Sequence, residues 1–353
     1  MLLQLIPLIV IELITDEVDL TSLWELDRIG ITKEDFTPNE NKAQDLVIQS
    51  IEQFDTKYQV KLPFRNEDRP PTNFSVAKAQ LDSLYKYTFS KDHMLLKDYT
   101  EVFKKYHSLD FIEPIELDPK EGHFLPHRPI LKDSATTPVR AVFNASSRKK
   151  DTISLNGCLY PGPSLVTLLH DKLLEFRQGK YAAIADIVKA FHCILIHPEH
   201  RKYLKFLSYV DSRLQCWQFK VVPFGVTSSP YILQAVLKFH LLAQKTEFAQ
   251  QLISKFYVDN LMITSNAHDD LIHQKRIIDQ LLLGANMKLQ GWTSSSIPFN
   301  QEFHIEEKVV QNLLGIPWNT DEDRLYVSIP DLSKFLDTHE ITKRQLTFLV
   351  ASI

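Results

Sequence analysis

The pattern of apolar positions divides the middle of the chain into a helical part followed by extended segments. Between residues 74 and 106, apolar side chains recur every three or four positions, which predicts two helices. The period then changes to two: residues 125–132 and 139–144 are extended runs separated by a turn-rich hexapeptide, and they predict a β-hairpin. Alternation in the second run places Arg140 and Asn144 on the same face.

Further along, residues 164–177 predict an amphipathic helix, and the apolar run Tyr181–Asp186 predicts a strand. Ser229 followed by Pro230 predicts a helix start, with the Ser229 hydroxyl as the cap and the proline in the first turn. Residues 30–75 are rich in acids, asparagine and proline and predict mostly a linker, interrupted by a short strand near residues 58–63.

Composition places the chain among ordinary globular proteins. Of its 353 residues, 44% are apolar and 24% charged, and the 9 glycines and 3 cysteines exclude collagen-like and disulfide-stapled chains. The apolar run of residues 1–14 is broken by Gln4, Pro7 and Glu12 and is too short to span a bilayer. No basic residue precedes it and no cleavage site follows, so we expect no membrane association or secretion, and a cytoplasmic or nuclear location.

Charge is distributed unevenly along the chain. The net charge is −4, yet residues 120–220 hold 16 basic and 8 acidic side chains. Several of the basic residues fall close together: Arg128, Lys132, Arg140, Arg148, Lys149 and Lys150. Such a basic segment predicts either contacts with phosphates or a plain solvated face.

Two acidic positions can carry chemistry. Asp186 ends an apolar strand, where it serves either as a metal ligand or as a helix cap. Asp259 and Asn260 lie between two apolar runs and predict a hairpin with a two-residue Asp-Asn turn. If both strand ends meet in space, the two carboxylates suit Mg²⁺, which binds to few protein oxygens and completes its shell with phosphates and water.

A loop between these acids contains Gly225, in a chain that is poor in glycine. A glycine there lets the backbone approach a flat partner such as a nucleotide base, and a tight turn explains it equally well.

In this order along the chain, the motifs resemble those of the reverse transcriptases of retroelements. They are Lys132…Arg140, Asp186…Phe191, Pro223-Phe-Gly225…Ser229-Pro230, Tyr257-Val-Asp259-Asn260 and Leu313-Leu-Gly315-Ile-Pro-Trp318. Other phrases are similar to the Bel/Pao group of long-terminal-repeat retrotransposon polyproteins: Trp24-Glu-Leu, Tyr58-Gln-Val-Lys-Leu-Pro63, Arg140-Ala-Val-Phe-Asn-Ala-Ser146 and Ile341-Thr-Lys-Arg-Gln345.

The resemblance implies an α+β fold, that of a right-hand polymerase with fingers and a ferredoxin-like palm. In it, Asp186, Asp259 and Asn260 form the catalytic set, and the two aspartates hold Mg²⁺ or Mn²⁺. The resemblance also implies that five further residues contact the incoming deoxynucleoside triphosphate or the template: Lys132, Arg140, Phe191, Gly225 and Gln234. Gly315 and Trp318 position the primer end, although Phe191 and Trp318 taken singly also fit plain core aromatics.

The resemblance also sets expectations for the domains and partners. Residues 1–60 are expected to link protease and polymerase regions, 61–318 to form fingers and palm, and 319–353 to begin a thumb or connection that is largely missing. The expected partners are an RNA or DNA template-primer and deoxynucleotides. Asn260 replaces the second acid of the family's Tyr-x-Asp-Asp turn, so two functions stay open: an active RNA-directed DNA polymerase core, or a truncated remnant that binds nucleic acid without catalysis.

Overall fold

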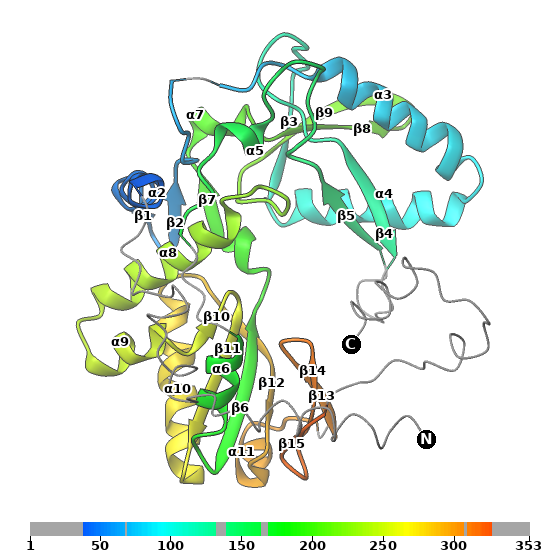
Figure 1. Cartoon of the computed structure of the whole chain (residues 1–353). Helices are drawn as coiled ribbons and strands as arrows, with labels where there is room; N and C mark the ends of the chain where they lie inside the picture. The colour runs from blue at the N-terminus through cyan, green and yellow to red at the C-terminus, as the bar shows by residue number, and fades with distance from the viewer. Residues whose placement is uncertain (1–37, 68, 132–138, 164–168, 307–308, 327–353) are drawn as a thin grey trace, which may run out of the picture.

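The computed structural model describes residues 38–67, 69–131, 139–163, 169–306 and 309–326. Helices and small sheets are mixed along the chain, as predicted, and form an upper and a lower region joined near α8 (Figure 1). No helix in the part of the chain described is long and apolar enough to cross a membrane.

The upper region packs a helical pair against two small antiparallel sheets. Its elements are α3 (Phe74–Leu84), the π-helix η3 (Tyr85–Phe89), α4 (His93–Ser108), β3 (Ile112–Ile115), β4 (His127–Leu131), β5 (Val139–Phe143), β8 (Lys205–Val210) and β9 (Arg213–Phe219). Strands β3, β9 and β8 form one sheet, and β4 and β5 the other. The predicted helices and hairpin are therefore confirmed, and α4 is capped by Asp92, whose side chain accepts from the Leu95 amide at 2.8 Å.

The lower region is built on a four-stranded antiparallel sheet in the order β10-β11-β6-β12. Its elements are α6 (Leu169–Phe176), β6 (Tyr181–Ile187), α8 (Ser229–Ala243), α9 (Glu247–Ile253), β10 (Phe256–Tyr257), β11 (Asn260–Ser265), α10 (His268–Leu283), β12 (Leu289–Ser294) and α11 (Ile297–Glu302). The predicted strand at Tyr181 is the inner strand β6. Of the predicted helix at residues 164–177, the described part is α6.

Short elements connect the two regions and extend the lower one. The connecting elements are α2 (Pro38–Gln49), β1 (Glu52–Phe54), β2 (Lys57–Val60), α5 (Leu155–Cys158), the 3₁₀ helix η4 (Ala190–Cys193), β7 (Ile194–Ile196) and α7 (Pro198–Arg201). Strand β2 pairs parallel to β7, and β13 (Val310–Leu313), β14 (Ile316–Asn319) and β15 (Arg324–Leu325) form a separate antiparallel sheet.

The prediction of a linker over residues 30–75 is wrong for residues 38–60, which form α2, β1 and β2, whereas the short strand predicted near residues 58–63 is confirmed by β2. Helix α2 packs against α8 through Ala43 and Val47, both fully buried. Tyr58 of β2 is buried too, and its hydroxyl lies 2.9 Å from Nδ1 of His240 on α8. Among the described side chains of α2, Asn39, Asn41 and Asp45 are exposed, whereas Ala43 and Val47 are buried.

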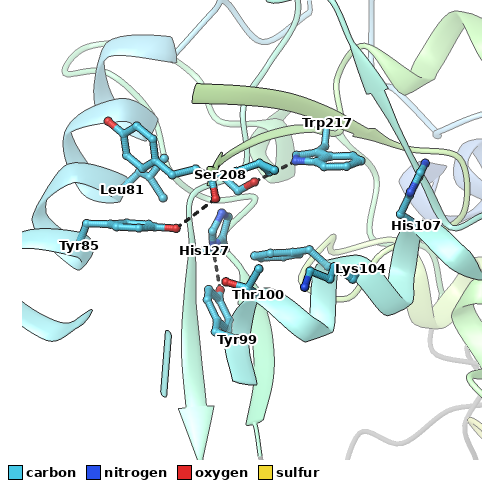
Figure 2. A pocket seen from close by; sticks show the side chains of 12 residues that line it. Leu81, Tyr85, Tyr99, Thr100, Lys104, His107, His127, Ser208 and Trp217 are labelled. Carbon is cyan, nitrogen blue, oxygen red and sulfur yellow. Dashed lines mark hydrogen bonds between the residues drawn. The ribbon is translucent and has the colours of Figure 1, made fainter. Parts of the chain in front are cut away.

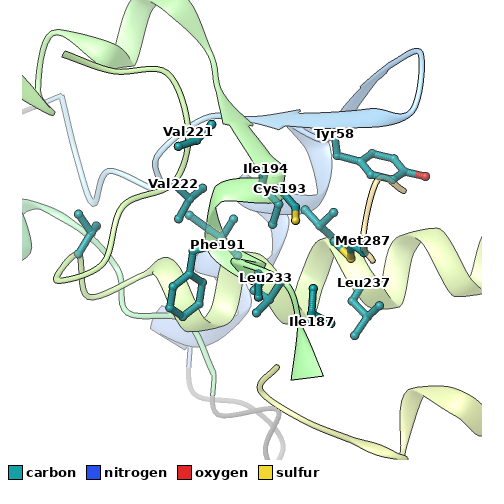
Figure 3. Close-up of a cluster of buried hydrophobic side chains, with 14 of the residues drawn as sticks. Tyr58, Ile187, Phe191, Cys193, Ile194, Val221, Val222, Leu233, Leu237 and Met287 are labelled. Atoms are coloured by element: carbon teal, nitrogen blue, oxygen red, sulfur yellow. The ribbon is translucent and has the colours of Figure 1, made fainter. Parts of the chain in front are cut away.

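The main core runs continuously between the two regions. Side chains from several elements meet where they join, among them Ile187, Phe191, Ile194, Val222, Leu233 and Met287 (Figure 3). Ile187 ends β6 and Phe191 lies in η4, so the chain that carries Asp186 is fixed on both sides by buried residues. A smaller cluster under the other face of the sheet contains Trp318.

Candidate active site

Alternation along β6 decides where Asp186 points. Ala183 and Ala185 face the main core, while Ala182 and Ile184 face the smaller cluster with Trp318. Asp186 follows on this second face, where the strand leaves the cluster and the side chain becomes exposed. The Asp186 carboxylate is therefore accessible to solvent, while its backbone is held in a hydrogen-bonded strand.

Asp259 lies in the turn between β10 and β11, and this turn begins one residue earlier in the chain than we predicted. Tyr257 pairs with Asn260, so the turn residues are Val258 and Asp259, and Asn260 is the first residue of β11. The predicted Asp-Asn turn is wrong because Asn260 also pairs across the sheet, directly opposite Asp186. That second pairing fixes Asn260 as a strand residue.

The turn is strained. Val258 has φ of +58°, a conformation that β-branched residues rarely adopt and that glycine usually supplies at the first position of such hairpin turns. Strain of this kind costs about 1–3 kcal/mol and persists where surrounding contacts enforce it. One such contact is the Ile187 amide, which donates to the Asp259 carbonyl at 3.0 Å and ties the turn to the end of β6.

The strain predicts an effect of Val258→Gly. Glycine adopts positive φ without a steric penalty, so relief of the strain should offset the lost contacts of the Val258 side chain with the core, and we expect the free energy of unfolding to change by less than about 1 kcal/mol. The measurement is urea unfolding of both proteins, with Val102→Gly in α4 as the control, where glycine should destabilise. Equal destabilisation by the two substitutions would show that Val258 is not strained.

The pKa values of both aspartates are raised in the folded protein. Burial raises the pKa of Asp186, and the charge of Asp259 raises it further. Burial also raises the pKa of Asp259, although its own backbone amide and the Asn260 side chain partly offset this. Asn260 Nδ2 donates to Asp259 Oδ1 at 3.0 Å. A carboxylate whose ionisation is disfavoured by a neighbouring carboxylate marks a place where a cation would bind.

The donor set fits a hard divalent cation. Within the described residues, no group of three or more histidine, cysteine, aspartate or glutamate side chains could hold a metal ion. The protein thus offers a pair of carboxylates, which is the small share of the coordination shell that Mg²⁺ usually takes from protein when phosphates and water supply the rest.

Sequence reasoning missed Gly291, which lies beside this pair. Strand β12 pairs with β6 at Gln290 opposite Asp186, and its register then shifts between Gln290 and Thr293. Gly291 occupies the bulge with φ of +65°, and a Cβ there would lie 4.0 Å from Asp186 Oδ2. A glycine inside a strand of a glycine-poor chain was the available signal.

The loop that contains Gly225 is held tightly. Gly225 has φ of +93°, and a Cβ would lie 2.3 Å from the Phe143 carbonyl oxygen of β5. The Asn156 side chain donates to the Gly225 carbonyl at 3.1 Å and accepts from the Thr227 amide at 2.9 Å. Within the protein, therefore, Gly225 serves the contact between this loop and β5, and Asn156 is a second residue that we missed.

Ser229 and Gln234 lie on α8, the helix that follows this loop. The predicted capping role of Ser229 is wrong: Ser228 is the N-cap residue, and its side chain makes no capping hydrogen bond. The Ser229 hydroxyl instead donates to the Pro223 carbonyl at 2.7 Å, because the loop folds back over the helix start. Gln234 lies one turn further along and is half-buried.

Phe191 lies five residues after Asp186, in η4. Its side chain is 8% exposed, and its ring meets the exposed ring of Phe224 edge to face at 4.7 Å between centroids. Phe191 thus packs as a core residue (Figure 3) and also supports an aromatic side chain next to Gly225.

Arg140 projects from the hairpin of the upper region. Cross-strand pairs Arg128–Val142 and Ile130–Arg140 share one face of β4 and β5, and all four side chains are exposed. The predicted alternation is therefore confirmed. Within the described residues, neither arginine is in an ion pair. Lys132 lies outside the described residues.

Gly315 and Trp318 lie in the β13–β14 hairpin, on the sheet face that carries Asp186. Leu314 and Gly315, with φ of +52° and +94°, form its two-residue turn. Trp318 is fully buried, its ring lies 5.0 Å from Phe176, and its Nε1 donates to Asp323 Oδ1 at 2.9 Å. Trp318 therefore anchors the hairpin under the sheet, while Gly315 lies in the free turn.

Residues 138–291 match the family model described as reverse transcriptase (RNA-dependent DNA polymerase). A search of curated proteins found no match to the chain. The matched segment contains Arg140, Asp186, Phe191, Gly225 and the Asp259 turn, whereas the β13–β14 hairpin lies beyond it. The part of the chain that brings the two carboxylates together is therefore similar to a reverse transcriptase domain.

Proposed function

We propose that the chain is the RNA-directed DNA polymerase core of a Bel/Pao-type long-terminal-repeat retrotransposon. It would add deoxynucleotides to a primer 3′-hydroxyl along an RNA template. The observation that carries the proposal is the placement of Asp186 and the Asp259 turn on paired ends of β6 and β11, inside the segment similar to reverse transcriptases. In this proposal residues 61–318 form fingers and palm, with residues 1–60 before and 319–353 after them.

Asp186 and Asp259 would hold Mg²⁺ or Mn²⁺. Two such ions stabilise the attacking and leaving oxygens when a phosphoryl group is displaced in line. Asn260 would support metal binding in a different way from the aspartate that the Tyr-x-Asp-Asp turn usually has at this position. Its amide nitrogen donates to Asp259 and thereby fixes the orientation of that carboxylate, which is ready to bind before the substrate arrives.

The upper hairpin would bind the nucleotide. Arg140 suits the triphosphate because a guanidinium group donates two parallel hydrogen bonds to phosphate oxygens, and Lys132 would add a second charge. Phe191 would limit the space at the sugar 2′ position. Gly225 and Gln234 would lie along the nucleotide and template path, and the turn at Gly315 would guide the primer end, with Trp318 as its buried anchor.

Arg140→Ala provides a test of this assignment. Loss of an exposed phosphate contact should raise the KM for deoxynucleotides roughly tenfold, with a smaller change in kcat. The measurement is steady-state primer extension. Arg128→Ala is the matched control, since Arg128 lies on the same face two residues before Ile130, the cross-strand partner of Arg140. Equal effects of the two substitutions on KM would contradict a specific role for Arg140.

The proposed activity itself is tested by primer extension on an RNA template with Mg²⁺ or Mn²⁺. We expect metal-dependent incorporation of deoxynucleotides that EDTA abolishes. Absence of extension with both metals, by protein that binds the template-primer, would reject the polymerase and favour the second candidate function.

That second candidate is a remnant that binds nucleic acid without catalysis. Two observations favour it: a neutral residue at position 260, and exposed arginines on β4 and β5 that form no ion pair within the described part. Binding that depends on phosphate contacts should weaken by roughly tenfold or more between low and physiological salt. Binding that is insensitive to salt would exclude the basic hairpin as the binding surface.

A further inference from the structure

The upper region contains a cavity that none of the residues discussed above lines. It lies between the α3–η3 segment, α4 and the β8–β9 pair, and its volume is about 160 Å³ (Figure 2). The inner wall is aromatic, formed by Tyr85, Tyr99, Phe103, His127 and Trp217, and Thr100 and Lys104 stand nearer the solvent.

The polar groups of the inner wall are occupied by one another. His127 Nε2 lies 2.7 Å from the Leu207 carbonyl, which only accepts, so Nε2 carries the proton. Nδ1 must then accept from the Tyr99 hydroxyl at 2.7 Å. Burial lowers the pKa of His127 to about 4, so the ring is neutral at physiological pH. Trp217 Nε1 donates to Ser208 Oγ at 2.9 Å.

A cavity with such walls does not hold water well, because a buried water needs two to four polar partners. Its volume is comparable to that of an engineered apolar cavity of about 150 Å³ that stays dry and binds benzene. One aromatic ring therefore fits the space, and the aromatic wall offers it edge-to-face contacts.

Tyr85 is the wall group with hydrogen-bonding capacity to spare. Its hydroxyl donates to the Tyr209 carbonyl at 3.5 Å, the longest bond in the wall. Tyr85 also begins the π-helix η3, where the Ser90 amide bonds back to the Tyr85 carbonyl across five residues. Wide turns of this kind occur frequently at functional sites. Lys104 at the mouth is paired with Glu101, so the entrance favours a neutral ligand.

We propose that this cavity binds a small neutral aromatic molecule, one ring with one polar substituent, the ring between Tyr99 and Trp217 and the substituent at the Tyr85 hydroxyl. The site is separate from the paired aspartates. The β4–β5 hairpin connects it to the loop that contains Gly225: His127 pairs with Phe143 in the β4–β5 ladder, and the Phe143 carbonyl is the atom that Gly225 approaches.

The probes are 4-fluorophenol and fluorobenzene, followed by ¹⁹F NMR on the full chain. We expect saturable binding of 4-fluorophenol with a Kd of roughly 0.1–1 mM, as suits so small a ligand. Thr100→Met should fill the cavity and weaken binding at least tenfold. Lys97→Met, on an exposed position of the same helix that does not line the cavity, should leave the Kd within twofold. Tyr85→Phe should weaken the binding of 4-fluorophenol several-fold and leave the binding of fluorobenzene unchanged.

Intermolecular NOEs between 4-fluorophenol and the Trp217 indole in the unmodified chain locate the ligand even if a variant fails to fold. Their presence supports the proposal. Absence of saturable binding overturns it, and so does binding that a folded Thr100→Met variant retains, because the ligand would then occupy another site.

Discussion

Asp186→Asn and Asp259→Asn are each expected to lower the rate of primer extension by roughly a thousandfold or more, because each removes a charged oxygen ligand from a cation that must stabilise the reacting phosphoryl group. Asp186 lies at the end of β6 and Asp259 in the turn before β11, and the charge of Asp259 disfavours ionisation of Asp186. Neither substitution changes side-chain volume much. The loss should therefore appear in kcat, measured at saturating nucleotide.

The same substitutions should leave the fold intact. Asp269→Asn is the control, because Asp269 is an exposed acid in the first turn of α10, and we expect it to keep nearly full activity. A variant at position 186 or 259 that retains more than a tenth of the activity would contradict the assignment of that residue as a metal ligand.

The free energy of unfolding, measured without metal, gives an independent test of the raised pKa of Asp186. Because the pKa of Asp186 is raised in the folded protein, ionisation costs stability as the pH rises from the ordinary carboxyl pKa through the raised value. At neutral pH, Asp186→Asn should raise the free energy of unfolding, by less than about 1 kcal/mol since the side chain is only partly buried. Below the ordinary carboxyl pKa the difference should vanish.

Gly225→Ala is expected to produce the largest loss of stability, about 2 kcal/mol or more. The new methyl group would lie 2.3 Å from the Phe143 carbonyl oxygen, and φ of +93° is unfavourable for alanine. Either the loop or β5 must move, which separates the lower region from the hairpin that carries Arg140. The measurement is the midpoint and slope of urea unfolding.

Gly315→Ala separates the cost of the positive φ from the cost of the steric clash. Gly315 has φ of +94°, and nothing lies within 4 Å of the position of its Cβ. This substitution carries the conformational cost alone, about 1 kcal/mol. If Gly225→Ala costs no more than Gly315→Ala, the close approach to Phe143 does not exist in solution.

Local patterns in the sequence predicted the elements that carry the site. The apolar run at Tyr181 gave strand β6 with Asp186 at its end, and period-two alternation gave the exposed face of β5. These predictions succeed because burial on one face of a strand determines side-chain direction residue by residue. The helix start at Ser229 was predicted too, but its hydroxyl bonds to a loop that lies outside the local pattern.

The remaining features depend on contacts between distant segments. An Asp-Asn dipeptide is a favourable turn by itself, yet the pairing of Asn260 with Asp186 moves the turn onto Val258 against its local preference. The bulge at Gly291 and the clamp at Asn156 likewise arise from partners more than 60 residues away. No local pattern contains such information.

The most direct test of the central claim is cleavage by iron bound in place of magnesium. Fe²⁺ with ascorbate and peroxide produces hydroxyl radicals that cut the polypeptide close to the bound ion. We expect cuts around Asp186, Asp259 and Gln290, which neighbouring strands bring together, and we expect Mg²⁺ to suppress all three. Cuts at only one of these segments, or elsewhere in the chain, would contradict a cation shared by the two aspartates.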